Sequence, residues 1–347
     1  MAAKIALFNH KGGVSKTTTT FNLGWMLASQ GARVVIVDAD PQCNLTGMVL
    51  GYRGPTELET LYRDHPERNI KAALAPAFES QPRTVDAVDC IEVDRCERLF
   101  LLPGHVGLAE NEVTLGIAQE LSGSIQALQN LPGAISWMLD RTAEHHNADF
   151  VLVDMSPGLG AINQNLFATS DYFIVPTNPD FFSVMAIDSL SNVIPRWQDW
   201  ASRAAENVVL RDAAYPFPAP NSRFLGTVIQ KFRPRKGAPS AAFAEWITEI
   251  QARIDDTLLP ALDRAGMLLD RERYTACGIA DDYTLGVIAD FNSLIAASQL
   301  HQTPIFALTA EQIGKVGVVL EAAEGSRDDF GREFEALARR VHCLTAP

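Results

Sequence analysis

Short apolar runs alternate with helical patterns along most of the chain, and this alternation is typical of a parallel sheet. Lys4–Phe8 and Arg33–Val37 are mostly apolar runs of strand length. Between them, Lys16–Gln30 has the apolar spacing of a helix, and Gly31 is positioned to end it. Parallel strands need a crossover connection, so this strand–helix–strand order predicts a βαβ unit.

The same alternation continues toward the C-terminus. Further strands are expected at Phe150–Val153, Tyr172–Val175, Leu225–Ile229 and Thr303–Phe306, with a crossover helix at Ala161–Thr169. Prolines interrupt residues 51–97, which predicts an irregular helical insertion there. We expect residues 325–344 to form a closing amphipathic helix with Phe330, Phe334, Leu337 and Val341 in one stripe. We expect one α/β domain over residues 1–347: a doubly wound, mostly parallel twisted sheet with helices on both faces.

Composition and charge narrow the class of protein. Hydrophobic residues make up 47% and charged residues 20% of the chain, which excludes wholesale disorder. The net charge of −13 argues against a basic surface overall. The five cysteines are scattered and form no CxxC pair, so we expect a reducing compartment and no zinc ribbon. The N-terminus lacks a signal-peptide pattern, and no apolar run is long enough to span a membrane, which predicts a cytoplasmic protein.

A glycine-containing turn between the first strand and the first helix has the context of a phosphate-binding loop. It reads KGGVSKTT over Lys11–Thr18. Gly12 and Gly13 allow backbone N–H groups to approach an anion, and the helix N-terminus adds a favourable dipole. Lys16 supplies a charge for the β- and γ-phosphates, and the Thr17 hydroxyl suits Mg²⁺.

The loop departs from the strict G-x-x-x-x-G-K-[ST] pattern at two positions. His10 and Ser15 stand where that pattern has glycine. If residue 15 needs a positive φ, serine there costs about 1 kcal/mol or more. If the residue has ordinary helical geometry, serine only adds a hydroxyl near the phosphates. We expect the second case, because Lys16 and Thr17 keep their register with the first strand.

Two further motifs follow in order. VDADPQCN lies at Val37–Asn44, and FVLVDMSP lies at Phe150–Pro157 on an expected strand. With the loop, they resemble the motifs of the ParA/MinD family of deviant-Walker P-loop ATPases, specifically its ParA branch. Weaker matches continue as far as TPIFAL at Thr303–Leu308, so the resemblance spans nearly the whole chain.

The resemblance implies a Mg²⁺-dependent ATP hydrolase that is slow and is stimulated by a partner. Asp40 would position the attacking water, with Lys11 and Lys16 as the other catalytic residues. Thr17, Asp38 and Asp154 would hold the metal. The nucleotide would be bound by the loop residues Lys11, Gly12, Gly13, Val14, Ser15, Lys16, Thr17 and Thr18, and by Gln230, where the family often has an adenine-reading Asn.

The resemblance also implies partners. Lys11 would reach the phosphates of a second subunit and close an ATP-dependent homodimer. The nucleotide state would thus switch the protein between monomer and dimer, and a ParB-like or adaptor protein would return the dimer to the monomer. The ATP-bound dimer would associate with the nucleoid. ParA-type proteins bind DNA without sequence preference. Residues 213–244 contain no acidic residue and five cations, Arg223, Lys231, Arg233, Arg235 and Lys236, which makes them the candidate DNA contact.

Other functions remain open from the sequence. His10 and Ser15 are compatible with a nucleotide-gated scaffold of negligible hydrolysis. A MinD-like positioning ATPase would use a C-terminal helix on the membrane surface, but here the polar face of that helix mixes acids and bases. We expect the helix to dock on the sheet, without stable membrane insertion. A biotin-pathway synthetase or a nitrogenase-type iron protein is a third class, and the scattered cysteines argue against the latter. The cargo could be a chromosome, a plasmid or a protein assembly.

Overall fold

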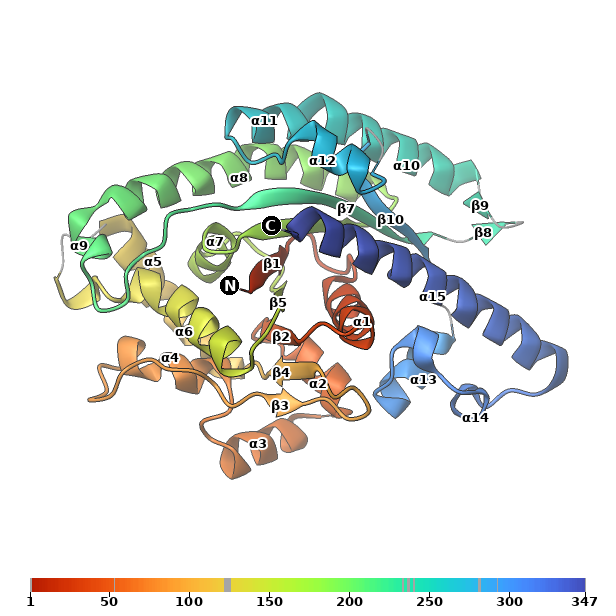
Figure 1. Cartoon of the computed structure of the whole chain (residues 1–347), viewed down its shortest axis with the longest axis horizontal. Coiled ribbons are helices and arrows are strands. Elements are labelled where there is room, and N and C mark those ends of the chain that lie inside the picture. The colour runs from red at the N-terminus through yellow and green to blue at the C-terminus, as the bar shows by residue number, and fades with distance from the viewer. Residues whose placement is uncertain are drawn as a thin grey trace.

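The computed structural model describes residues 2–52, 54–121, 126–232, 234–235, 238–239, 241–279, 282–291 and 293–346. Its centre is an eight-stranded sheet in the order β10-β7-β6-β1-β5-β2-β4-β3, in which only β3 runs antiparallel to its neighbour (Figure 1). The strands are β1 Ala3–Leu7, β2 Val34–Ala39, β3 Ile91–Glu92, β4 Leu99–Leu102, β5 Phe150–Met155, β6 Tyr172–Thr177, β7 Arg223–Phe232 and β10 Thr284–Ala289. Strands β8 (Pro234–Arg235) and β9 (Ala238–Pro239) form a separate antiparallel pair. The predicted fold class is confirmed.

Both faces of the sheet are buried, which explains why its strands read as continuous apolar runs. In β1, Ile5 and Leu7 pack on one face, whereas Ala6 packs on the other. In β2, Val34 packs on the same face as Ile5 and Leu7, whereas Val35 packs on the face of Ala6. Side chains alternate along a strand, so an entirely apolar run requires a helical layer on each side.

Helices provide those two layers. The first layer comprises α4 Ile70–Phe78, α5 Asn111–Leu121, α6 Leu131–His145, α7 Ala161–Ala168, α8 Phe181–Glu206, α10 Ala241–Arg253 and α11 Leu259–Arg264. The second layer comprises α1 Lys16–Ser29, α2 Asn44–Leu50, α12 Arg271–Ala276, α13 Leu294–His301, α14 Ala310–Ile313 and α15 Gly317–Thr345. The remaining α-helices are α3 Pro55–Asp64 and α9 Val208–Arg211, and the short turns are η1 Val106–Glu110, η2 Gln126–Leu128, η3 Ile254–Leu258 and η4 Ile305–Ala307.

Most predicted elements are confirmed within two residues, but the last strand was misplaced. Thr303–Phe306 is not a strand, and Ile305–Ala307 forms the short turn η4. Pro304 has no N–H to donate to a strand ladder, which disfavours this segment as a strand. The eighth strand is instead Thr284–Ala289, which pairs with β7. Gly286 interrupts its apolar pattern and concealed it in the sequence.

The C-terminal helix docks on the sheet, as expected. Helix α15 begins at Gly317, earlier than predicted, and its stripe of Phe330, Phe334, Leu337 and Val341 is buried in the core shared with α1 and β10. This stripe is therefore covered within the chain.

Cysteine pairing departs from the expectation. Cys277, which follows α12, and Cys343 in α15 form a disulfide with a Cα–Cα distance of 5.6 Å. Sequence spacing could not reveal the pair, because 66 residues separate the two positions and only the packing of α15 brings them together. The pairing removes the cysteine-based argument for a reducing compartment.

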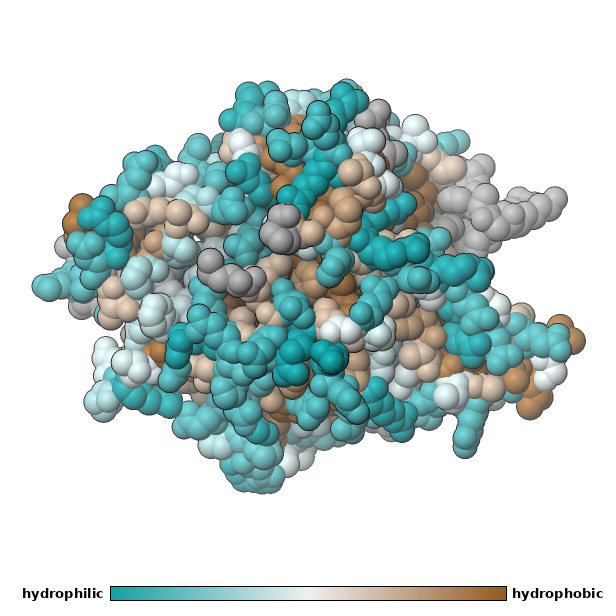
Figure 2. All heavy atoms as spheres, in the orientation of Figure 1, coloured by the Kyte–Doolittle hydropathy of each residue, from teal (hydrophilic) through white to brown (hydrophobic). Residues whose placement is uncertain are grey.

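The molecular surface is mostly polar in the view of Figure 2, with hydrophobic side chains in separate patches. One patch lies where α15 begins and includes the exposed residues Val316, Val318 and Val319. Within the described ranges, no helix has the length and hydropathy needed to cross a membrane.

Candidate functional site

The loop between β1 and α1 contains two residues in the left-handed backbone region. Gly13 has φ 74°, and Ser15, which caps α1, has φ 61° and ψ 29°. The expectation of ordinary helical geometry at Ser15 was therefore wrong. A side chain in this region costs about 1–2 kcal/mol, so Ser15 keeps the loop shape that glycine would give, at the expense of stability.

The loop opens into a cleft of about 1240 Å³ at the carboxyl ends of the strands. Gly12, Gly13, Val14, Ser15, Lys16, Thr17, Thr18 and Asp40 all line it. A second hollow, of about 1280 Å³, lies at the opposite edge between the two ends of the chain and contains none of the predicted site residues. Parallel sheets bind ligands at the carboxyl ends of their strands, so we assign the site to the loop cleft.

Sequence reasoning missed the outer walls of the cleft. Met48, Tyr52 and Leu58 come from α2, α3 and the segment between them, and Ala296, Gln299 and Leu300 come from α13. These segments carry no phosphate or metal motif, so only the folded chain reveals their position.

Lys16 is held at the base of the loop. Its Nζ donates hydrogen bonds to the carbonyl oxygens of Asn9 at 2.9 Å and of Lys11 at 3.4 Å. Burial lowers the pKa of the ammonium, and the charges of Asp154 and Asp40 oppose that shift. The Lys16 ammonium therefore lies near the carboxylates of Asp154 and Asp40, at the N-terminus of helix α1.

Asp38 and Asp154 lie side by side beneath the loop. They are paired in the register of β2 and β5, and both are almost fully buried. Asp38 Oδ2 accepts hydrogen bonds from the backbone N–H of Thr46 at 2.7 Å and from its hydroxyl at 2.6 Å. The Thr17 hydroxyl lies near Asp154, yet neither Oδ atom of Asp154 makes a hydrogen bond of normal geometry.

The chemistry of this group fits a divalent cation. Burial raises the pKa of Asp154, the charge of Asp38 raises it further, and Thr17 and Lys16 oppose the shift. Burial likewise raises the pKa of Asp38, to about 6, against the two bonds from Thr46. A buried carboxylate without hydrogen bonds is costly unless a cation balances it. Carboxylate and hydroxyl oxygens are ligands that Mg²⁺ prefers, so Asp154 and Thr17 fit that ion.

The pKa of Asp38 predicts how stability depends on pH. Its folded pKa lies above its usual 3.8, so proton binding favours the folded state and the stabilisation is lost as pH rises through about 6. The full contribution is about 3 kcal/mol, and about half of it is lost between pH 5 and pH 7.5. Urea unfolding of the nucleotide-free protein should show this loss relative to Asp38→Asn. An equal pH dependence in both proteins would contradict it.

Asp40 follows the end of β2 and faces the cleft. Its Oδ1 accepts a hydrogen bond from the backbone N–H of Gln42 at 3.0 Å, which orients the carboxylate. Its position at the wall of the cleft is compatible with the predicted role of orienting a water molecule.

Lys11 has partners within its own chain that the sequence did not reveal. Its Nζ contacts both carboxylate oxygens of Asp180 at 2.5 Å and Ser183 Oγ at 2.9 Å. Asp180 also caps helix α8 by accepting from the backbone N–H of Ser183. Only the folded sheet brings Lys11 and Asp180 together, because they follow the adjacent strands β1 and β6.

Gln230 is buried near the end of β7. Its side-chain amide donates to the hydroxyl of Thr19, the residue of α1 that follows the phosphate-binding loop. Its role toward adenine stays a prediction.

Of the cations in the predicted basic segment, the described residues place the side chain of Arg223. Arg223 begins β7, and its guanidinium donates to the carbonyl oxygens of Gly266 and Leu268. The ten residues of β7 span about 30 Å, and Arg223 begins this strand, whereas Lys231 lies near its end. The contribution of Arg223 to the DNA contact stays a prediction. Arg233 and Lys236 lie outside the described residues, and the side chains of Lys231 and Arg235 are not described either.

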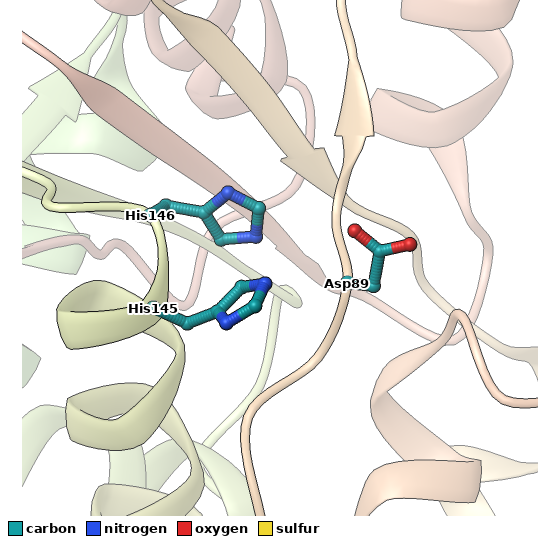
Figure 3. Close-up of side chains that lie close together, drawn as sticks. All are labelled: Asp89, His145 and His146. Carbon is teal, nitrogen blue, oxygen red and sulfur yellow. The ribbon is translucent and has the colours of Figure 1, made fainter.

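Away from the cleft, the described residues contain one cluster of potential metal ligands, Asp89, His145 and His146 (Figure 3). His146 Nε2 already lies 3.1 Å from both the Val88 carbonyl oxygen and the Cys90 backbone nitrogen. The Asp89 carboxylate pairs with Arg68. The His146 contacts attach residues 88–90 to the end of α6, and the Asp89–Arg68 pair attaches the same segment to the chain before α4, so we assign the cluster a structural role.

Comparison with known proteins identifies the family. Residues 2–206 match the model of a family described as an AAA domain. Over 194 residues, the chain is 30% identical to the sporulation initiation inhibitor protein Soj of Bacillus subtilis, a match that covers 56% of this chain and 65% of Soj. The chain belongs to the ParA/MinD family of P-loop ATPases. The chain spans 54–65% of the length of the curated relatives that it matches.

Solved structures show the fold of this ParA/MinD-family chain over more of its length. Protein DIP2308 of Corynebacterium diphtheriae matches with a TM-score of 0.63 and 21% identity, covering 86% of this chain and 97% of that protein. The structure of pNOB8 ParA bound to nonspecific DNA matches with a TM-score of 0.54 and 18% identity, covering 99% of each chain.

Proposed function

We propose that this ParA/MinD-family chain is an ATP-dependent, dimerising ATPase switch that partitions or positions DNA or a protein cargo. The observation that carries the proposal is the cleft lined by the phosphate loop, which includes Lys16, and by Asp40. The buried pair Asp38 and Asp154 lies beneath this loop. Soj, one of the relatives, is named for inhibiting sporulation initiation, and a further relative in Caulobacter vibrioides is named a chromosome partitioning protein.

Each site residue is assigned a separate role in phosphoryl transfer to water. That reaction needs charge neutralisation and an oriented nucleophile rather than covalent help from the protein. Loop amides and Lys16 would bind the β- and γ-phosphates. Thr17 and Asp154, with Asp38 beside them, would hold Mg²⁺, which supplies positive charge to the phosphates when bound. Asp40 would orient the attacking water, and Gln230 would face adenine.

Exposed apolar side chains around the cleft support a homodimer. They come from η1, α5, the loop after β5 and the start of α8: Val106, Val113, Ile117, Leu159, Phe181, Phe182 and Met185. These segments follow the parallel strands β4, β5 and β6, so they share the edge of the sheet with the phosphate loop. Apolar side chains gathered at one edge favour a protein partner. Lys11 would leave Asp180 to reach the phosphates of the second subunit.

DNA is the proposed binding surface for the ATP-bound dimer, and a ParB-like or adaptor protein is its proposed protein partner. The support is the acid-free segment with Lys231, Arg233, Arg235 and Lys236, and the fold shared with pNOB8 ParA, whose structure contains nonspecific DNA. A dimer would present these cations twice, so several phosphates could be contacted together.

We expect the dimer to bind random-sequence duplex DNA with ATP and Mg²⁺ but not with ADP. Replacing Arg233, Arg235 and Lys236 with Glu should eliminate this binding and spare nucleotide binding. For every DNA phosphate that the protein no longer neutralises, the slope of log K against log salt should become shallower by about 0.9. Fluorescence anisotropy at several salt concentrations measures both the affinity and this slope. The matched control reverses the exposed residues Arg196, Arg203 and Arg211. An unchanged affinity and slope in the first variant would refute the patch.

A further inference from the structure

Helix α7 begins directly after the loop that follows Asp154, and it has no cap of its own. Its N-cap is Gly160, which has no side chain to accept from the first N–H groups of the helix. Helix α5 supplies the missing cap, because the Glu112 carboxylate accepts from the backbone N–H groups of Ala161 and Ile162. A carboxylate at this end of a helix also interacts favourably with the helix dipole.

The loop 156–160 is in turn fixed to α7. Asn163 Nδ2 donates to the carbonyl oxygens of Ser156 at 2.9 Å and of Gly158 at 3.0 Å. Within this loop, Pro157 lines the nucleotide cleft and packs beside Gly12 of the phosphate loop. Contacts thus continue from the phosphate loop through Pro157 and α7 to Glu112.

Helix α5 also carries exposed apolar side chains. Val113 and Ile117, about one turn apart on this helix, are 70% and 44% exposed, and Leu159 in the loop is 44% exposed. Gln119, near the other end of α5, donates to the Ala161 carbonyl oxygen at 3.1 Å. Helix α5 is therefore joined at two points to the start of α7, which holds the loop, and apolar side chains project from α5 and from the loop.

We propose that Glu112 is a positioning residue that couples the loop at the nucleotide cleft to the apolar face of α5. Nucleotide that shifts Pro157 would carry α7 with it and, through Glu112, would reorient Val113 and Ile117. This inference rests on the proposed nucleotide switch and adds the link by which the nucleotide would reach the dimer surface.

The structure supplies an independent way to break the link. Gly160 has φ −77° and ψ 176°, a backbone that alanine adopts without strain. A Cβ at this position would overlap Glu112 Oε1, the end of a flexible side chain that can move away. Gly160→Ala should therefore displace the carboxylate while leaving the backbone as it is.

The experiment compares Glu112→Ala, Glu112→Gln, Gly160→Ala and the double variant Glu112→Ala/Gly160→Ala in the full chain. Each is titrated with Mg²⁺-ADP and a non-hydrolysable ATP analogue. Dimerisation is measured by sedimentation, and amide exchange is measured over residues 111–121. Glu120→Ala is the matched control, because Glu120 is exposed on the same helix.

In Glu112→Ala, we expect ADP affinity within about twofold of wild type, dimerisation weakened at least about tenfold, and loss of analogue-induced protection in α5. Glu112→Gln should be intermediate, because the two N–H groups face different oxygens of Glu112, and Gln replaces one of these oxygens with an NH2 donor. Gly160→Ala should match Glu112→Ala, and the double variant should show no further loss, as expected for two changes to one interaction.

Protection of residues 111–121 that equals wild type in Glu112→Ala would overturn the proposal. So would a parallel loss of ADP affinity, which would indicate general destabilisation. If the wild-type protein binds the analogue without dimerising, the proposed dimerising switch is contradicted. The coupling through Glu112 is still tested in that case, because amide exchange over α5 shows whether the analogue protects this helix.

Discussion

Replacing Lys16 with alanine is expected to lower the affinity for ATP at least about 100-fold. Lys16 is buried at the base of the loop with Asp154 and Asp40 as its charged neighbours. Without the ammonium, these carboxylates would repel the phosphates that it attracts in wild type. Truncating one member of a buried charge pair costs about 2–5 kcal/mol, which corresponds to a loss of about 30-fold to about 5,000-fold and includes the expected value.

Calorimetry with Mg²⁺-ATP measures the loss directly. Lys315→Ala is a matched control, because that lysine contacts Ser293 on the exposed surface of the C-terminal part of the chain. Undiminished affinity in Lys16→Ala would remove the phosphate-loop assignment.

Asp40→Ala should retain ATP binding and lose turnover by at least about 100-fold. The carboxylate is oriented by the Gln42 N–H at the wall of the cleft, and it is assigned to the attacking water rather than to the bound phosphates. Loss of the correct placement of a reacting group can cost about 10²-fold in rate.

Phosphate release under saturating Mg²⁺-ATP, with the ATP affinity measured in parallel, separates these effects. Asp256→Ala, at an exposed position, is the control. Turnover that equals wild type in Asp40→Ala would exclude the assigned role, and a matching loss of affinity would make Asp40 a binding residue.

Local patterns in the sequence were sufficient to predict much of this site. The strand–turn–helix context of KGGVSKTT and the apolar runs before Asp38 and Asp154 predicted which residues meet at the carboxyl edge of the sheet. These inferences succeeded because β-strands and P-loops are encoded by neighbouring residues whose order fixes their place in a parallel sheet.

Features that depend on distant contacts or on backbone angles could not be predicted in this way. Ser15 has a residue type that is common in helical geometry, and only its φ shows the left-handed conformation. The Lys11–Asp180 contact and the Cys277–Cys343 pair each join segments that only the folded sheet brings together. The separation of Arg223 from Lys231 along β7 follows from the length of this strand, which the apolar run Leu225–Ile229 underestimated.

Control of self-association by nucleotide is the central property of the proposed switch, and sedimentation of the full chain tests it most directly. With Mg²⁺ and a non-hydrolysable ATP analogue the protein should sediment as a dimer, and with ADP as a monomer. Lys11→Ala should bind the analogue and stay monomeric, because the ammonium that would contact the second subunit's phosphates is gone. A wild-type chain that stays monomeric when saturated with the analogue would contradict the proposed switch, as would a Lys11→Ala variant that dimerises as wild type does.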